Sequence, residues 1–144
     1  MSQITFEHIS EGDREKASNS YVMSVAAIVV GLPLPIINLI ATLIFYLGNK
    51  KSSPFVRWHC TQALLSQAVL FLLNTRGFWW TVSILFWDEP ISNEYIGYMI
   101  GIGVLNLVEF FATIVAAVQV RKGKHLRLWL FADLTDTFFK KNDE

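Results

Sequence analysis

The stretch YIGYMIGIGVLNLVEFFATIVAAVQV, residues 95–120, decides the fold class of this chain. Glu109 is its only charged residue. A helix needs about 20 mostly apolar residues to cross the hydrocarbon core of a bilayer, and this stretch exceeds that length. It therefore predicts a transmembrane helix that carries one carboxylate in its middle.

A second stretch, residues 21–47, contains no charged residue at all. It is interrupted by Gly31-Leu-Pro-Leu-Pro35, and proline breaks or kinks a helix because it lacks the backbone N–H. Each half is too short to cross a bilayer alone. We favour one kinked span over 21–47, with a re-entrant pair of helices as the alternative.

The region between these stretches predicts one more span, over about residues 56–74. Asn74-Thr-Arg-Gly77 interrupts it, and the aromatic run at 78–87 is too short to cross. We favour an interfacial segment in an aromatic belt for 78–87. The alternative is one long, tilted helix with Arg76 near its far end.

The two ends of the chain differ from the middle. Residues 1–18 form a polar N-terminal tail, residues 19–125 the helical membrane domain, and residues 126–144 a cytoplasmic amphipathic segment. In the last segment apolar residues recur near helical spacing, namely Leu126, Leu130, Leu134 and Phe138. The expected fold is all-α: a polytopic membrane protein with three transmembrane helices, or four as the alternative, plus interfacial helices.

Composition agrees with a membrane location. Of the 144 residues, 53% are hydrophobic and 17% charged, whereas soluble domains are about 25% charged. The formal net charge is zero, so no electrostatic case exists for nucleic-acid binding.

Basic residues gather at 48–57 and 121–127, which the positive-inside rule places in the cytoplasm of a bacterium, with the chain multi-pass in its inner membrane. Three spans would put the N-terminus outside, whereas a hairpin first segment would put both termini inside.

Glu109 is the residue most in need of an explanation, because a carboxylate in the middle of a span costs roughly 3 kcal/mol. It lies about 16 Å from the cytoplasmic end of its helix at 1.5 Å per residue. Polar residues at similar depth could form one layer across three helices: Asn106, Asn38, Gln67, Ser66 and Gln62. The favoured interpretation is a hydrogen-bonded carboxyl that fixes helix packing; the alternative is an ion-handling group.

Other motifs are weaker. Gly97 and Gly101 form a GxxxG pattern, which predicts a closely packed helix face inside the chain or between subunits. His59 and Cys60 are adjacent, but adjacent helical positions point about 100° apart, and the chain has one cysteine. We therefore expect no metal site, no cofactor and no catalytic residue.

One run of residues indicates a family. Ser53-Pro-Phe-Val-Arg-Trp-His-Cys-Thr-Gln-Ala-Leu64 resembles a run in small bacterial membrane proteins related to the Tic twenty component of the chloroplast inner-envelope import apparatus. The later run Arg121-Lys-Gly-Lys-His-Leu-Arg-Leu128 resembles a second motif of those proteins. The resemblance implies a three- or four-helix bundle without enzymatic activity, and a structural hinge formed by Ser53, Pro54, Phe55, Val56, Arg57, Gln62 and Ala63.

These observations predict a non-enzymatic accessory or scaffold subunit. Its partners would be the lipid bilayer and a larger inner-membrane complex, such as one that moves protein, or further copies of itself. The alternative function is a small homo-oligomeric channel or transporter that uses Glu109.

Overall fold

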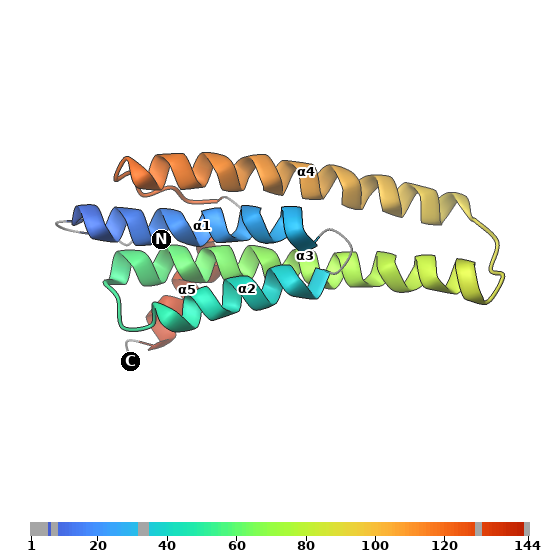
Figure 1. The fold of residues 1–144 in the computed structure, drawn as a ribbon, viewed down its shortest axis with the longest axis horizontal. Coiled ribbons are helices and arrows are strands. Elements are labelled where there is room, and N and C mark those ends of the chain that lie inside the picture. Colours follow the sequence, from blue (N-terminus) through green and yellow to red (C-terminus); the bar gives the residue numbers. More distant parts are fainter. Residues whose placement is uncertain (1–5, 7–8, 32–34, 129–130, 143–144) are drawn as a thin grey trace.

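The computed structural model describes residues 6, 9–31, 35–128 and 131–142, and within them every element is a helix. The helices are α1 (Glu11–Gly31), α2 (Pro35–Gly48), α3 (Pro54–Phe86), α4 (Asn93–Arg121) and α5 (Ala132–Asn142). In Figure 1 the long helices α3 and α4 run antiparallel, and α1 and α2 pack along one half of their length. The other half of the α3–α4 hairpin extends beyond them.

Local sequence explains where the long helices begin and end. Pro54 occupies the first turn of α3, where its missing N–H costs nothing. Ser92 caps α4 by accepting a hydrogen bond from the Tyr95 N–H at 3.1 Å. Gly123 ends α4 with φ of 78°, a left-handed conformation that glycine adopts without strain. The chain can therefore turn sharply after α4 and run back along the bundle.

Residues 21–31 belong to α1 and residues 35–47 to α2, and these two helices pack against each other. The single kinked span that we favoured is therefore wrong. Helix α1 already begins at Glu11, inside the predicted polar tail, and it packs against α2, α3 and α4. Pro35 is the first residue of α2, a position that proline favours. The residues at 32–34 lie outside the described part of the chain.

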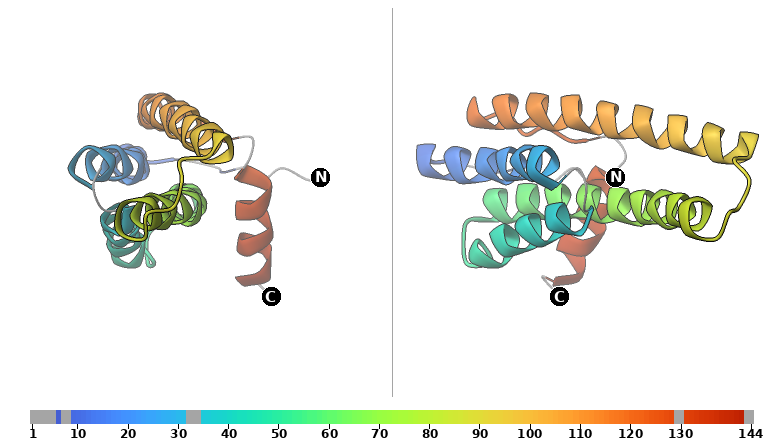
Figure 2. Two further views of the ribbon diagram at one scale, coloured as in Figure 1. Left: turned by 90° about the vertical axis from the view of Figure 1, so that its right-hand side faces the viewer. Right: turned by 45° about the vertical axis from the view of Figure 1, so that its right-hand side comes forward.

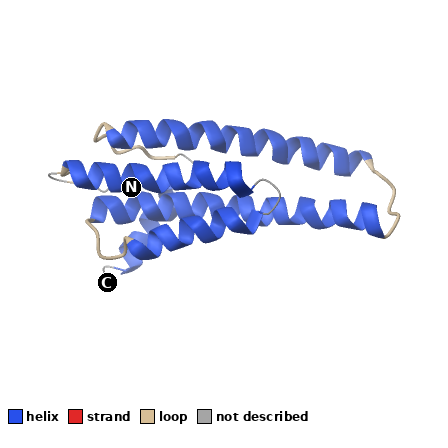
Figure 3. Ribbon diagram, in the orientation of Figure 1, coloured by secondary structure: helices blue, strands red, loops and turns tan. Residues whose placement is uncertain are grey.

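The predicted break at 74–77 is also absent, because α3 continues to Phe86 (Figure 3). Asn74 and Gly77 are contact positions for α4 rather than turn residues. Asn74 forms two hydrogen bonds with Asn106, of 2.8 and 3.1 Å. The aromatic run at 78–87 is thus the end of one long helix, as the alternative interpretation had it.

Helices α3 and α4 are the two described helices that are long and apolar enough to cross a membrane. Only 11% of the most apolar part of α3 and 17% of that of α4 are buried. A core helix of a water-soluble protein would be largely buried instead. The buried apolar core lies at the end where α1, α3 and α4 pack together, and small residues such as Ala17, Ala63, Ala116 and Ala117 allow close packing there.

Candidate functional site: a buried polar network at one end of the bundle

A chain of polar contacts links α1 and α3 within this core. The Tyr21 hydroxyl lies 2.8 Å from His59 Nδ1, and Gln62 Nε2 donates to the same hydroxyl at 2.7 Å. All three side chains are at most 1% exposed. Because Gln62 donates to the hydroxyl oxygen, the hydroxyl proton is free to go to His59 Nδ1.

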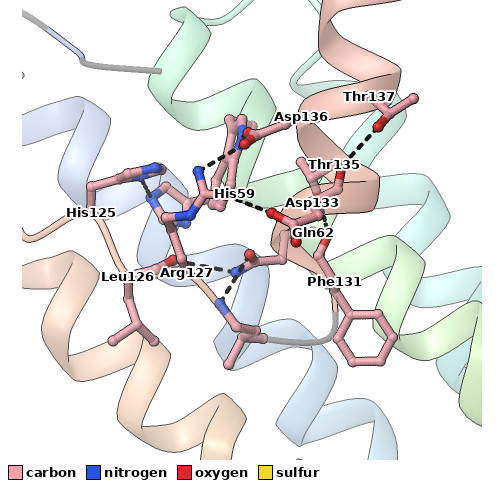
Figure 4. A network of polar contacts seen from close by, with 12 residues as sticks. His59, Gln62, His125, Leu126, Arg127, Phe131, Asp133, Thr135, Asp136 and Thr137 are labelled. Carbon is pink, nitrogen blue, oxygen red and sulfur yellow. Dashed lines mark hydrogen bonds and ion pairs between the residues drawn. The ribbon is translucent and has the colours of Figure 1, made fainter. Parts of the chain in front are cut away.

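The segment after α4 folds back onto this chain of contacts (Figure 4). Gln62 Oε1 accepts from the Leu128 N–H at 3.2 Å, and Gln62 Nε2 also donates to the Leu126 carbonyl at 3.4 Å. His125 Nδ1 lies 3.3 Å from His59 Nε2. One amide side chain therefore holds both α1 and the returning segment.

The donor in each histidine contact depends on which ring nitrogen carries the proton. If Tyr21 donates to Nδ1 of His59, a neutral His59 carries its proton on Nε2 and donates to His125 Nδ1. His125 then carries its proton on Nε2, which is buried and has no hydrogen-bond partner among the described residues. The geometry therefore suits two neutral imidazoles. Burial, and then the positive charge of Arg127, lower the pKa of His125, whereas Asp136 raises it.

A second set of contacts attaches α5 beside the network. Trp58 Nε1 donates to Asp136 Oδ1 at 2.8 Å, and Arg127 contacts the same carboxylate at 2.8 Å and Asp133 at 3.1 Å. The guanidinium of Arg57 lies 5.0 Å from the ring centre of Phe139. Trp58 is fully buried, because Ala132 and Phe139 of α5 pack with it.

The motif from Ser53 to Ala63 is thus part of the packed core of the bundle. Phe55, Val56 and Ala63 are at most 2% exposed, and Gln62 points inward to the network. Pro54 begins α3 and is itself exposed. The hinge role expected for this motif stays a prediction.

Glu109 lies one level further along the bundle and is 7% exposed. Thr113 Oγ1 donates to Glu109 Oε1 at 3.3 Å, and Ser66 on α3, whose hydroxyl donates to the Ala63 carbonyl at 3.0 Å, lies near the same carboxyl group. Gln67 is buried, but its Nε2 has no partner among the described residues. The arrangement around Glu109 is a closed contact between α3 and α4.

The single polar layer that we expected is divided into three levels along α3. Gln62 belongs to the network with Tyr21, Ser66 meets Glu109, and Asn106 pairs with Asn74 further along. The side chain of Asn38 lies outside the described part of the structure. Four-residue spacing along α3 separates the first two levels by about 6 Å, too far for one connected layer.

The GxxxG glycines of α4 face no other helix. A Cβ atom added at Gly97 or Gly101 would meet nothing within 4 Å. Close approach occurs instead at Gly77 of α3, where a Cβ atom would lie 3.0 Å from Ile102 Cδ1 and 3.2 Å from Met99 Sδ. No motif marks Gly77 as a packing position, because a single glycine carries no spacing.

Comparison with known families identifies the family of the chain. A family model described as the magnetosome magnetite crystal formation protein family matches residues 17–134, most of the chain. The chain belongs to this family. No curated protein and no solved structure matches it.

The magnetosome family match overturns the resemblance to proteins related to the Tic twenty component, which was wrong. The expected connection with protein import rested on that resemblance and is not supported either. The short run at 53–64 was the main support for that resemblance, whereas the family model is matched along almost the whole bundle. The matched range of the magnetosome family contains every residue of the network, from Tyr21 to His125.

A metal centre is a natural question for a family named after magnetite. Among the described residues, no three histidine, cysteine, aspartate or glutamate side chains are grouped so that they could hold a metal ion. His59 and His125 approach each other, but they contribute two nitrogen atoms only. The contacts in the network serve to join α1, α3 and the returning segment.

Proposed function

We propose that this chain is a non-enzymatic, membrane-embedded helical protein that takes part in magnetite crystal formation. The observation that carries the proposal is the magnetosome family match over residues 17–134. The exposed apolar surfaces of α3 and α4 support the membrane location. Contacts between helices engage the Tyr21 hydroxyl with Gln62, and Asn74 with Asn106, which supports a structural role.

The aromatic residues suggest where the bilayer lies. Arg57, the last basic residue before the apolar part of α3, and Trp79 lie 22 residues apart, or about 33 Å at 1.5 Å per residue, close to a hydrocarbon thickness of about 30 Å. Trp80 packs against Tyr95 and Tyr98 at the far boundary. Aromatic residues favour such boundaries, so we place the bilayer between these two levels.

Charge supports one orientation. Exposed basic residues gather at the end where α1 begins and α4 ends: Lys50, Lys51, Arg121, Lys122 and Lys124. The opposite tip of the α3–α4 hairpin carries Asp88, Glu89 and Glu94. The basic end therefore faces the cytoplasm in our proposal, with the chain in a bacterial membrane.

The hairpin of α1 and α2 enters the bilayer from the basic end and returns to it. It covers only part of α3 and α4 (Figure 1), and Ser18 of α1 donates to the Ala117 carbonyl near the basic end of α4 at 2.8 Å. From Ser18 to Gly31 the helix rises about 20 Å, less than a full hydrocarbon thickness. Two full spans and one re-entrant hairpin place both ends of the chain on the cytoplasmic side.

Glu109 fits this structural role better than ion handling. Its carboxyl group accepts a hydrogen bond from Thr113 on the same helix and lies near Ser66 of α3. An accessory protein that packs beside other membrane proteins, or beside copies of itself, is the function that we propose.

Two measurements in the source bacterium test this proposal. The first uses a strain in which a tagged copy replaces the gene, and the second uses a strain from which the gene is removed. First, a tagged chain should stay with the membrane pellet after an alkaline carbonate wash, and release into the supernatant would refute membrane embedding. Second, removal of the gene should change the size or number of magnetite crystals seen by electron microscopy. Re-expression of the natural chain should restore them, and unchanged crystals after removal would refute the role in crystal formation.

A further inference from the structure

Helix α5 has one face that no other part of the described chain covers. Ala132, Thr135 and Phe139 are buried against the bundle, at 3%, 0% and 6% exposure. Leu134 and Phe138 are 47% and 51% exposed, although both are large and apolar. They are four residues apart, so they form one stripe along the helix.

The polar residues of α5 form a separate stripe. Asp133 and Thr137 are also four residues apart and are exposed. Each lies one residue before a member of the apolar stripe, which is a rotation of about 100° around the helix. Helix α5 thus presents a core face, an apolar face and a polar face, as expected of a helix that borders protein, lipid and water at once.

The placement of α5 fits such a border. In the left view of Figure 2 the other helices are seen nearly end-on, while α5 runs across them. It is attached at the level of Trp58 by the bond from Trp58 Nε1 to Asp136. Given the bilayer position in the proposed function, a helix that crosses the bundle axis at this level lies flat in the membrane interface.

We propose that α5 binds the surface of an anionic lipid bilayer through Leu134 and Phe138. The inference rests on the proposed membrane location. The apolar stripe enters the boundary between acyl chains and headgroups, and the polar stripe faces water. Four exposed lysines at the same end of the bundle, Lys50, Lys51, Lys122 and Lys124, attract the anionic headgroups.

The test uses single cysteines that carry an environment-sensitive fluorophore (NBD) in the full chain. Cys60 is buried and is removed by Cys60→Ala. The purified protein is reconstituted in vesicles of phosphatidylcholine with phosphatidylglycerol. Probes at L134C and F138C report the apolar stripe, and D133C and T137C are matched controls on the polar stripe of the same helix. V108C, on the exposed face of α4, reports whether the chain spans the bilayer at all.

Acyl-brominated lipid should quench the probes at 134 and 138, whereas aqueous iodide should quench those at 133 and 137. Iodide quenching at 134 and 138 equal to that at 137 would overturn the proposal, and so would protection of 134 and 138 from both quenchers, which would indicate a protein partner. Absence of quenching at 108 by brominated lipid would refute the proposed membrane location itself. Quenching at 108 but not at 134 or 138 would refute only the lipid contact of α5.

Headgroup selectivity is read from the same samples. In vesicles of phosphatidylcholine alone, the probes at 134 and 138 should lose part of their brominated-lipid quenching, because the lysines no longer have anionic partners. Equal quenching in both vesicle types would overturn the anionic preference. K122Q/K124Q should reproduce the loss in the anionic vesicles if these lysines attract the headgroups.

Discussion

The contact at Gly77 offers a sharp test of how α3 and α4 pack. We predict that Gly77→Leu destabilises the bundle, because a Cβ atom at this position would already lie 3.0 Å from Ile102 Cδ1 and 3.2 Å from Met99 Sδ. Favourable contacts between carbon atoms lie at about 3.5–4.0 Å, and leucine adds three further carbons beyond Cβ. Overpacking of this kind typically costs about 1–3 kcal/mol.

The location of Gly77 favours a value near the middle of that range. The two atoms that it would meet are the ends of flexible side chains, so Gly77→Ala should cost much less than Gly77→Leu. No part of α1 or α2 is drawn beside this half of α3 in Figure 1, so the α3–α4 contact alone resists separation there. We therefore expect Gly77→Leu to lower the free energy of unfolding by about 2 kcal/mol.

The assay is unfolding of the purified protein in mixed micelles by titration with sodium dodecyl sulfate, followed by far-UV circular dichroism. Gly101→Leu is the matched control, because a Cβ atom there meets nothing within 4 Å. It should keep or slightly raise the free energy of unfolding, since leucine favours the helix over glycine by up to about 1 kcal/mol. Ile102→Ala combined with Gly77→Leu should recover part of the loss, because it removes one of the two clashing side chains.

Equal free energies of unfolding for Gly77→Leu and Gly101→Leu would refute the packing of α4 on Gly77. The combination of Gly77→Leu with Ile102→Ala should lose less free energy of unfolding than the two single changes lose in sum. A loss equal to or larger than that sum would also count against this packing.

Three further predictions concern the polar contacts. Gln62→Leu leaves the buried N–H of Leu128 without an acceptor, so we expect the free energy of unfolding to fall by about 1–3 kcal/mol and hydrogen exchange in residues 124–128 to become faster. Unchanged exchange would contradict the role of Gln62 in holding that segment. Glu109→Gln keeps an acceptor for Thr113, so the free energy of unfolding should change by less than about 1 kcal/mol. Ion flux into reconstituted vesicles should not change either, and a specific loss of flux would favour the channel hypothesis. Because the pKa of His125 is lowered in the folded state, the unfolded chain takes up the proton first as pH falls below about 6.5. The contribution of His125 to stability is therefore full above that pH and is lost below it. His125→Gln should make the free energy of unfolding depend less on pH, and an equal dependence in both proteins would contradict the burial of a neutral imidazole.

The sequence predicted the helical class and revealed the two longest apolar segments, 21–47 and 95–120, because both properties depend on composition over many residues. The run at 95–120 lies entirely within α4. Uncharged length alone could not tell one kinked span from a hairpin, because Pro35 can kink a helix or begin one. The packing of α1 against α2, where the Ser24 and Thr42 hydroxyls lie 3.5 Å apart, distinguishes the two, and uncharged length does not predict that contact.

The same limit applies to the polar residues. Asn74 and Gly77 are common in turns, and the sequence does not reveal that α4 supplies a partner for each. The approach of His125 to His59 depends on the turn at Gly123, which brings the returning segment back into the core. The apolar spacing after residue 125 did indicate an amphipathic helix. However, Leu134 and Phe138 point away from the bundle, and Phe139 makes the internal contact.

The topology of two spans and one re-entrant hairpin is tested most directly by cysteine accessibility in intact cells. Single cysteines are introduced into the Cys60→Ala chain at three exposed positions, Glu11, Glu94 and Lys124, and treated with a maleimide that does not cross membranes. We predict that Glu94→Cys reacts from outside, while Glu11→Cys and Lys124→Cys react only after the cells are opened. Reaction of Glu11→Cys together with Glu94→Cys in intact cells would contradict the re-entrant hairpin and would restore three spans.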